Sequence, residues 1–245
     1  MTIVLASQAK ATAEDVQMWV YHNFPPFIVN EVERSGLSYQ LADQLTEMSG
    51  GKYAFNVVVM PRERLNNRIA TGTPGMALWA NPVWFGDPER ESFLWSSAVM
   101  EDQNDVISPV DLSLQYDGPT SLRGHTLVGV TGHRYPGVDR MIETGDVERV
   151  DVFAEDALVR FIASGRGDVA IVAQSAARYF VQANGLDDAV HFSGEPHSRY
   201  QRFILFQPGM GQVHDFVEGA LVQLRQSPEW RAAVGRYALD AKPEG

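Results

Sequence analysis

Cysteine is absent from all 245 residues, which excludes disulfide bonds, thiolate catalysis and cysteine-based zinc sites. Basic residues are scarce as well: 20 Lys and Arg stand against 31 Asp and Glu, a formal net charge of -11. This balance argues against a nucleic-acid-binding protein, which needs a basic face. No apolar run reaches the roughly 18 residues of a transmembrane helix. A hydrophobic content of 44% suits a globular chain with one large domain or two small ones.

The patterns of common catalytic and cofactor sites are missing too. The six histidines show neither H-E-x-x-H nor another tight metal-ligand spacing. Residues 192–197 lack the G-x-S-x-G turn of hydrolases, and no Gly-Lys-Ser/Thr follows the glycines between 129 and 137. We therefore expect no metal ion, no cofactor and no catalytic residue.

Two runs of alternating strand and helix patterns follow one another along the chain. The first run has expected strands and helices at 17–21, 39–48, 53–60, 62–70 and 76–79. The second run has them at 126–130, 137–143, 147–153, 155–164, 169–172 and 175–184. Further strands and helices are expected at 190–192, 202–206, 213–226 and 228–238. Each βαβαβ run predicts a parallel sheet with covering helices, so the expected fold class is α/β with two units.

The N-terminal residues carry a pattern typical of export. An apolar stretch, Ile3-Val4-Leu5-Ala6-Ser7, is followed by Ala9-Lys10-Ala11, which fits an A-x-A cleavage site. The charged region and most of the apolar region of a complete signal peptide are missing. Residues 1–15 are therefore expected to be either a signal remnant or a disordered N-terminus, and we favour a remnant and a periplasmic location.

Four segments stand in a characteristic order. They are His22–Phe27 (His-Asn-Phe-Pro-Pro-Phe), Pro88-Glu89-Arg90 with Trp95-Ser96 after it, Leu122–Tyr135, and Gly165–Val172. In this order and spacing, from about residue 16 to about residue 240, the chain resembles the polar-amino-acid type of extracellular solute-binding proteins. These receptors of ABC importers (family 3) have the type 2 periplasmic-binding fold. The resemblance implies two α/β lobes, joined by a two-strand hinge, that close on a small solute without chemistry on it.

The resemblance also implies a discontinuous lobe 1, because in this family the chain crosses to lobe 2 and returns. We place the crossings near 104–110 and 200–206 and expect a polar loop at 111–119 at the lobe junction. Lobe 1 then comprises 16–106 plus 205–245, and lobe 2 comprises 107–204.

Three residues of lobe 1 match ligand-contacting positions of the family. Arg90 matches the arginine that holds the ligand carboxylate, a task suited to a bidentate guanidinium; the alternative is a surface arginine paired with Asp87 or Glu91. Phe24 matches the aromatic residue that covers the ligand, and its alternative is packing against lobe 1. Arg62 stands where the family often has an aromatic residue; it favours a more anionic ligand unless it is simply exposed.

The segment from Trp79 to Phe85 departs from the family pattern, which has small hydroxyl residues here. Its three aromatic residues suit a stacking wall in a pocket. The alternative is packing in the core or between the lobes. We select Trp79, Asn81 and Trp84 as candidate ligand contacts, and their bulk argues against a simple small amino acid.

In lobe 2, a turn between a strand and a helix is the candidate anion site. It comprises Thr131, Gly132, His133, Arg134 and Tyr135. Free N–H groups at a helix start bind anions, and the carboxyl end of a parallel strand is a usual ligand position. His133 replaces the usual hydroxyl residue and would make binding pH-dependent.

Gln174 is the clearest departure from the amino-acid receptors. Those receptors often have an aspartate here that pairs with the ligand ammonium group. Glutamine still offers hydrogen bonds but no charge, which weakens the amino-acid assignment. The alternative is a residue near a helix start that faces solvent.

These observations predict a periplasmic receptor that binds a small polar solute carrying a carboxylate. The expected partner is the permease of an ABC importer in the inner membrane, and we expect a monomer without nucleic-acid partners. One alternative is a periplasmic ligand-sensing domain of a signalling protein. The other is a dehydratase on the same fold, for which His133 is the only candidate general acid or base.

Overall fold

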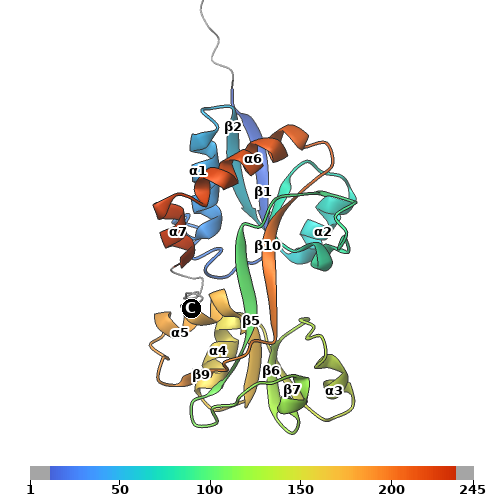
Figure 1. Cartoon of the computed structure of the whole chain (residues 1–245), viewed down its shortest axis with the longest axis vertical. Helices are drawn as coiled ribbons and strands as arrows, with labels where there is room; N and C mark the ends of the chain where they lie inside the picture. Colours follow the sequence, from blue (N-terminus) through green and yellow to red (C-terminus); the bar gives the residue numbers. More distant parts are fainter. Residues whose placement is uncertain (1–11, 236–245) are drawn as a thin grey trace, which may run out of the picture.

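The computed structural model describes residues 12–235, which form two lobes, one above the other in Figure 1. Residues 1–11, with the expected export segment, lie outside the described residues, as do residues 236–245. The first strand begins at Glu14, two residues before the expected start of lobe 1. No helix within residues 12–235 is long and apolar enough to cross a membrane.

The first βαβαβ run forms as predicted, with small shifts of the element bounds. Its members are β1 (Glu14–Val20), α1 (Leu37–Met48), β2 (Tyr53–Val59), α2 (Arg62–Ala70) and β3 (Met76–Ala80). Leu37, Leu41 and Leu45 recur at every fourth position of α1, and all three are completely buried. The helix ends shortly before Gly50 and Gly51, whose positive φ angles of 61° and 90° suit glycine.

The rest of the chain contains the second run and the elements that connect the lobes. Between the runs lie η1 (Pro82–Phe85), β4 (Leu94–Trp95), β5 (Met100–Pro109) and η2 (Pro119–Leu122). The second run comprises β6 (Thr126–Val130), α3 (Asp139–Glu143), β7 (Glu148–Val152), α4 (Glu155–Ala163), β8 (Val169–Ala173) and α5 (Gln174–Ala183). The last elements are β9 (Val190–Phe192), β10 (Ser198–Phe206), α6 (Gly211–Leu224) and α7 (Pro228–Gly235).

One continuous sheet links the lobes in the order β2-β1-β3-β10-β5-β8-β6-β7. In each lobe three parallel strands lie side by side in the sheet, and one antiparallel strand lies next to them, β10 in lobe 1 and β5 in lobe 2. β5 and β10 pair with each other over 100–104 and 198–202, a few residues before the expected crossings. This pair is the connection at the centre of Figure 1.

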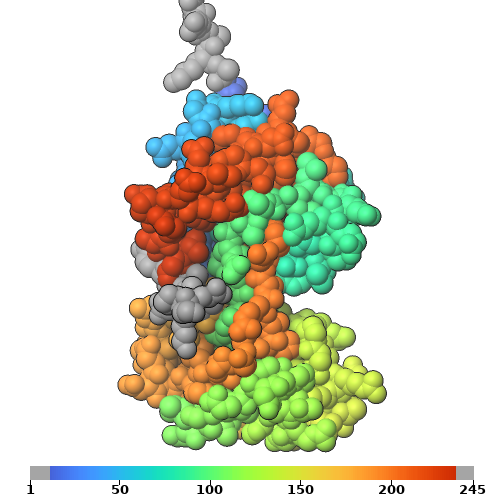
Figure 2. All heavy atoms as spheres, in the orientation of Figure 1, coloured from blue at the N-terminus to red at the C-terminus, as the bar shows by residue number. Residues whose placement is uncertain are grey.

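The strand directions determine which strand ends face the other lobe. β5 runs from lobe 1 into lobe 2, and β8 with its parallel neighbours β6 and β7 runs against it. β10 runs back into lobe 1, and β3 with β1 and β2 runs against it. The carboxyl ends of all six parallel strands therefore point toward the opposite lobe, and open α/β sheets bind ligands at such ends. Figure 2 shows that the molecule narrows at this level.

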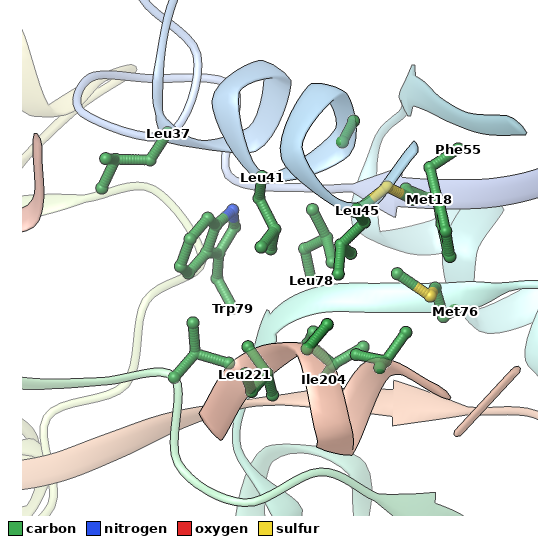
Figure 3. Close-up of a cluster of buried hydrophobic side chains, with 14 of the residues drawn as sticks. Met18, Leu37, Leu41, Leu45, Phe55, Met76, Leu78, Trp79, Ile204 and Leu221 are labelled. Carbon is green, nitrogen blue, oxygen red and sulfur yellow. The ribbon is translucent and has the colours of Figure 1, made fainter. Parts of the chain in front are cut away.

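Each lobe has its own hydrophobic core. In lobe 1, side chains of α1 and α6 pack onto β1, β3 and β10, and Figure 3 shows Leu41 and Ile204 on either side of Leu78. In lobe 2, Leu127 and Val128 are neighbours in β6 and belong to separate clusters, because successive strand residues point to opposite faces. Separate cores allow the lobes to move as units about β5 and β10.

The loop at 111–119 lies away from the lobe junction, which corrects the expectation. It follows the end of β5, where Pro109 pairs with Val190 at the far end of lobe 2 (Figure 1). Leu114 and Tyr116 of this loop are buried in the lobe 2 core. The expectation failed because β5 crosses earlier than assumed and continues through lobe 2. The lobe bounds given above stay a prediction.

Candidate ligand-binding site between the lobes

A histidine follows the central parallel strand of each lobe. His22 comes after β1, which lies between β2 and β3, and His133 comes after β6, which lies between β7 and β8. The charge of His133 helps to lower the pKa of His22, after burial and the Arg202 guanidinium as the larger causes. The two histidines are therefore within electrostatic range of each other although they follow strands of different lobes. The candidate site lies around them.

Arg202 on β10 is the centre of the polar contacts in this region and is 1% exposed. Its Nε and Nη2 atoms lie 2.9 and 2.8 Å from Asp102 Oδ2 on β5. Its Nη1 atom donates to the Trp79 backbone oxygen at 3.3 Å and to His22 Nε2 at 3.2 Å. Its Nη2 atom also donates to the Tyr200 hydroxyl at 3.1 Å. Because a guanidinium has five N–H donors, these contacts leave Arg202 without a free edge for a ligand carboxylate.

Asp102 extends this network into lobe 2. Its carboxylate accepts hydrogen bonds from the Ser175 hydroxyl at 2.8 Å and from the Ser175 N–H at 3.4 Å. Ser175 is the second residue of α5, so the carboxylate also lies at the positive end of that helix. Both side chains of the Asp102–Arg202 pair are 2% exposed. The buried pair thus connects lobe 1, the two crossing strands and lobe 2.

Aromatic rings surround His22 on the lobe 1 side. The ring centroids of Tyr21, Phe24, Phe27 and Trp84 lie 4.0 to 6.1 Å from the imidazole. Burial, with the positive charges nearby, holds the pKa of His22 well below 6.5, so the imidazole is neutral at pH 7. Phe24 is half-buried and Trp84 is 36% exposed. Lobe 1 therefore presents an aromatic, largely uncharged surface here.

Arg90 is exposed, and its guanidinium lies 4.2 Å from the centroid of the Phe203 ring. It forms no salt bridge within residues 12–235. Asp87, one of the two acids named above as alternative partners of Arg90, accepts hydrogen bonds from four other donors. They are the N–H groups of Glu91, Ser92 and Phe93 and the indole of Trp95, at 2.8 to 3.2 Å. The guanidinium edge of Arg90 is therefore available to a ligand carboxylate.

Trp79 and Asn81 have structural contacts. The Trp79 side chain is 1% exposed, and its indole N–H donates to Ser38 Oγ at 2.8 Å. Asn81 Oδ1 accepts from the Val83 N–H at the start of η1, and its Nδ2 donates to the Gln201 backbone oxygen at 2.9 Å. The Trp79 side chain therefore packs in the lobe 1 core, which was the alternative to a ligand contact. Asn81 links η1 to β10 by hydrogen bonds. Neither side chain is included in the site proposed below.

Arg62 and Trp84 lie together at the edge of lobe 1. The Arg62 guanidinium lies 4.0 Å over the Phe85 ring and donates to the Asn66 side chain and the Trp84 backbone oxygen. The Trp84 ring packs edge-on against Tyr200, with centroids 5.2 Å apart. Arg62 therefore supports Trp84, whose partly open ring belongs to the candidate site.

The turn after β6 does not begin a helix, so the expectation of free N–H groups at a helix start is wrong. α3 begins only at Asp139 and spans five residues. The N–H of Thr131 donates to the Val152 oxygen and that of His133 to the Val130 oxygen, both at 2.9 Å. These two N–H groups are thus occupied by backbone partners, and no helix dipole supports an anion here.

The residues of this turn divide into an exposed part and a buried part. The exposed residues are Thr131, Gly132, His133 and Arg134. Tyr135 is 4% exposed, and its hydroxyl accepts from the Val130 N–H at 3.2 Å. Arg134 forms an ion pair with Asp139 at 3.4 Å. Although His133 is exposed, the surrounding protein partly desolvates its imidazole and, with the Arg149 charge, lowers its pKa, so lobe 2 offers a neutral imidazole to the site.

Gln174 is 4% exposed, so the solvent-facing alternative for this residue is wrong. It lies near Asp105 of β5, which is 2% exposed and accepts from Gln103 Nε2 at 2.6 Å. Burial raises the pKa of Asp105 from 3.8 to about 6, against smaller opposite effects of the Gln103 hydrogen bond, the Arg178 charge and the Gln174 hydrogen bond.

Sequence reasoning missed four residues of the site, namely Asp102, Asp105, Tyr200 and Arg202. The sequence did carry a signal for these residues. Of the two strands that must pass between the lobes, one carries acidic residues and the other carries an arginine. Charges in buried strands need partners, which predicts their pairing. Among residues 12–235, no group of three or more His, Asp or Glu side chains is arranged to hold a metal ion.

Solved structures share this architecture. An ancestral arginine-binding protein bound to arginine matches with a TM-score of 0.71 and 14% identity over 93% of this chain and 99% of that chain. A histidine kinase sensor domain with similarity to periplasmic binding proteins gives 0.69 and 15%, over 92% and 96%. The substrate binding protein of an amino acid ABC transporter gives 0.66 and 16%, over 91% and 98%.

Identities this low establish the fold and leave the ligand open. No protein-family model and no curated protein matches the sequence. The strand order, the two lobes and the structural relatives agree with the fold class expected from the sequence. The chain therefore has the two-lobed type 2 periplasmic-binding fold of the amino-acid-binding proteins.

Proposed function

We propose that this protein is a receptor that closes on a small polar solute carrying a carboxylate, an amino acid or a related acid. In this proposal it is exported to the periplasm and delivers the solute to the permease of an ABC importer. The observation that carries the proposal is the exposed Arg90 guanidinium, which lies over the Phe203 ring of β10 and forms no salt bridge within residues 12–235.

The remaining contacts come from both lobes. Phe24 and Trp84 supply partly open ring faces on lobe 1. His133 supplies a neutral imidazole on lobe 2, next to the exposed turn residues Thr131 and Gly132. Because the ligand contacts both lobes only when they approach, it binds the closed form better and shifts the equilibrium toward it.

Replacing Arg90 tests the carboxylate contact. Arg90→Ala should weaken binding at least roughly tenfold, because a charge-assisted contact contributes about 1.5–3 kcal/mol. Titration calorimetry with carboxylate ligands that bind the native protein gives the comparison. Arg123→Ala is the matched control, since Arg123 is a 64% exposed arginine that pairs with Asp146. Equal affinities of the Arg90→Ala variant and the native protein would refute this role.

A sensory role is the second candidate, and the similarity to a histidine kinase sensor domain favours it. The same closure would then transmit a signal to a kinase in place of releasing solute to a permease. Neighbouring genes for a permease and an ATPase support transport, whereas a neighbouring kinase gene supports sensing. The dehydratase alternative stays a prediction, with His133 as its candidate acid or base.

A further inference from the structure

Exposed apolar side chains gather in the segments that face the opposite lobe. Within residues 12–235, nine large apolar residues are exposed, and five of them follow the carboxyl ends of β1, β3 and β7. These strand ends point toward the other lobe. Single exposed apolar residues are ordinary, but their concentration at one level of a molecule indicates a surface that becomes covered. The five residues are Val29, Val32, Val83, Trp84 and Phe153.

Phe153 is the most exposed of these residues, with 95% of its surface open to water. It lies between β7 and α4, directly after Val152. The Val152 backbone oxygen accepts hydrogen bonds from the N–H and the hydroxyl of Thr131, at 2.9 and 3.1 Å. Phe153 is therefore next to the turn after β6, on the side of lobe 2 that faces lobe 1.

The apolar residues of η1 are the counterpart on lobe 1. Val83 is 69% exposed and Trp84 is 36% exposed. The Trp84 ring lies 6.1 Å from the His22 imidazole, which is within electrostatic range of His133 in the turn after β6. The Trp84 backbone oxygen also accepts from Arg62, so η1 lies beside the start of α2. In Figure 1, α2 and β7 lie on the same side of the crossing strands.

We propose that Phe153 and η1 form an apolar closing contact, in which the Phe153 ring packs against Val83 and the open part of the Trp84 ring when the lobes approach. The contact goes beyond the proposed function because it needs no solute. Removing the ring from water favours the closed form by itself. The ligand-free protein is then a mixture of open and closed forms, and a ligand shifts this mixture further toward closure.

The size of this contact leaves closure reversible. Complete burial of a phenylalanine side chain shifts an equilibrium roughly ten- to hundredfold. A ring that is covered on one face by Val83 and Trp84 loses only part of its contact with water, so we expect a shift of roughly fivefold or more. A shift of this size populates the closed form without a solute. It leaves most of the closure to the ligand, because moving a mixture from almost fully open to almost fully closed needs about 10⁴-fold.

Distances between two spin labels test the contact, since the chain has no cysteine of its own and takes labels only at introduced cysteines. Asn67→Cys on α2 and Glu143→Cys on α3 are exposed positions, one on each lobe, on the same side of Figure 1. Pulsed electron paramagnetic resonance on refolded, ligand-free protein should show a longer and a shorter distance. Phe153→Ala should lower the ratio of the shorter to the longer population at least roughly fivefold. An unchanged ratio, or no shorter distance in the labelled native protein, would overturn the contact.

Further variants identify the partner of the ring. Val83→Ala should lower the same ratio roughly twofold, because it removes less apolar surface, and Phe153→Leu should retain most of the shorter population. Leu112→Ala is the matched control, since Leu112 is an apolar residue, 40% exposed, at the far end of lobe 2. It should leave the ratio unchanged. A loss of the shorter population in Phe153→Ala without any loss in Val83→Ala would place the partner of the ring elsewhere and contradict the inference.

Discussion

At the scale of single residues, the negative charge of buried Asp105 lowers the free energy of unfolding at neutral pH. Its folded pKa of about 6 lies above the value of 3.8 for the unfolded chain. A raised pKa means that this group favours folding below pH 3.8 and that the benefit is lost as the pH rises through 6. Buried carboxylates with shifted pKa values are more frequent at functional sites than elsewhere.

Replacing Asp105 should therefore stabilise the protein at neutral pH. Asp105→Asn is expected to raise the free energy of unfolding at pH 7.5 by up to about 3 kcal/mol, which corresponds to the pKa difference. The gain should shrink as the pH falls from 6 toward 4. Urea unfolding at several pH values measures it, with Asp111→Asn as control. A loss of stability at pH 7.5 would show that the hydrogen bonds of the carboxylate, such as that from the Gln103 amide, outweigh the cost of its burial.

His22 has the opposite dependence on pH. Its pKa lies well below 6.5 in the folded protein, so below pH 6.5 the unfolded chain binds more protons and stability falls with the pH. His22 should contribute a loss of about 1.4 kcal/mol per pH unit below pH 6. Thermal unfolding between pH 7.5 and 5 should show a shallower decline for His22→Gln. The same slope in variant and native protein would exclude this assignment.

At the scale of elements, the hinge strands β5 and β10 hold more of the site than their sequences suggested. Asp102 and Arg202 pair through the register of the two strands and are both 2% exposed. A buried pair of charges need not stabilise a protein by itself, but removing one partner leaves the other charge uncompensated.

Breaking this pair should be costly. Asp102→Asn is expected to lower the free energy of unfolding by roughly 3–5 kcal/mol, the usual result for one partner of a buried pair. Asp146→Asn, which breaks the exposed pair with Arg123, should cost less than about 1 kcal/mol. Denaturant unfolding of both variants gives the comparison. Similar small losses would mean that the hinge pair is hydrated and does not connect the lobes.

The elements themselves were largely predictable, because apolar periodicity and glycine stops are local signals. Leu41 and Leu45 identify the buried side of α1, and both βαβαβ runs formed where they were expected. The site was less predictable, because its contacts depend on tertiary register. The Trp79 indole turned to Ser38, and the N–H groups of the turn after β6 were occupied by backbone oxygens. Neither contact follows from local sequence.

At the scale of the whole molecule, two α/β lobes with separate cores are joined by one pair of strands. The carboxyl ends of their parallel strands face each other, so any ligand at this level contacts both lobes. Ligand binding and lobe closure are then linked, whether the closed form is read by a permease or by a signalling partner. The unpaired Arg90 guanidinium gives the protein its proposed preference for ligands with a carboxylate.

The most direct test of the receptor function is a thermal-shift measurement on protein that has been unfolded and refolded to remove carried-over ligand. The panel comprises amino acids, di- and tricarboxylates, polyamines and nucleobases. Ligand at about 100 times its dissociation constant adds about 2.7 kcal/mol of stability, which raises the unfolding midpoint by several degrees. We expect a shift confined to carboxylates, with amino acids foremost. No shift with any carboxylate of the panel would contradict the account.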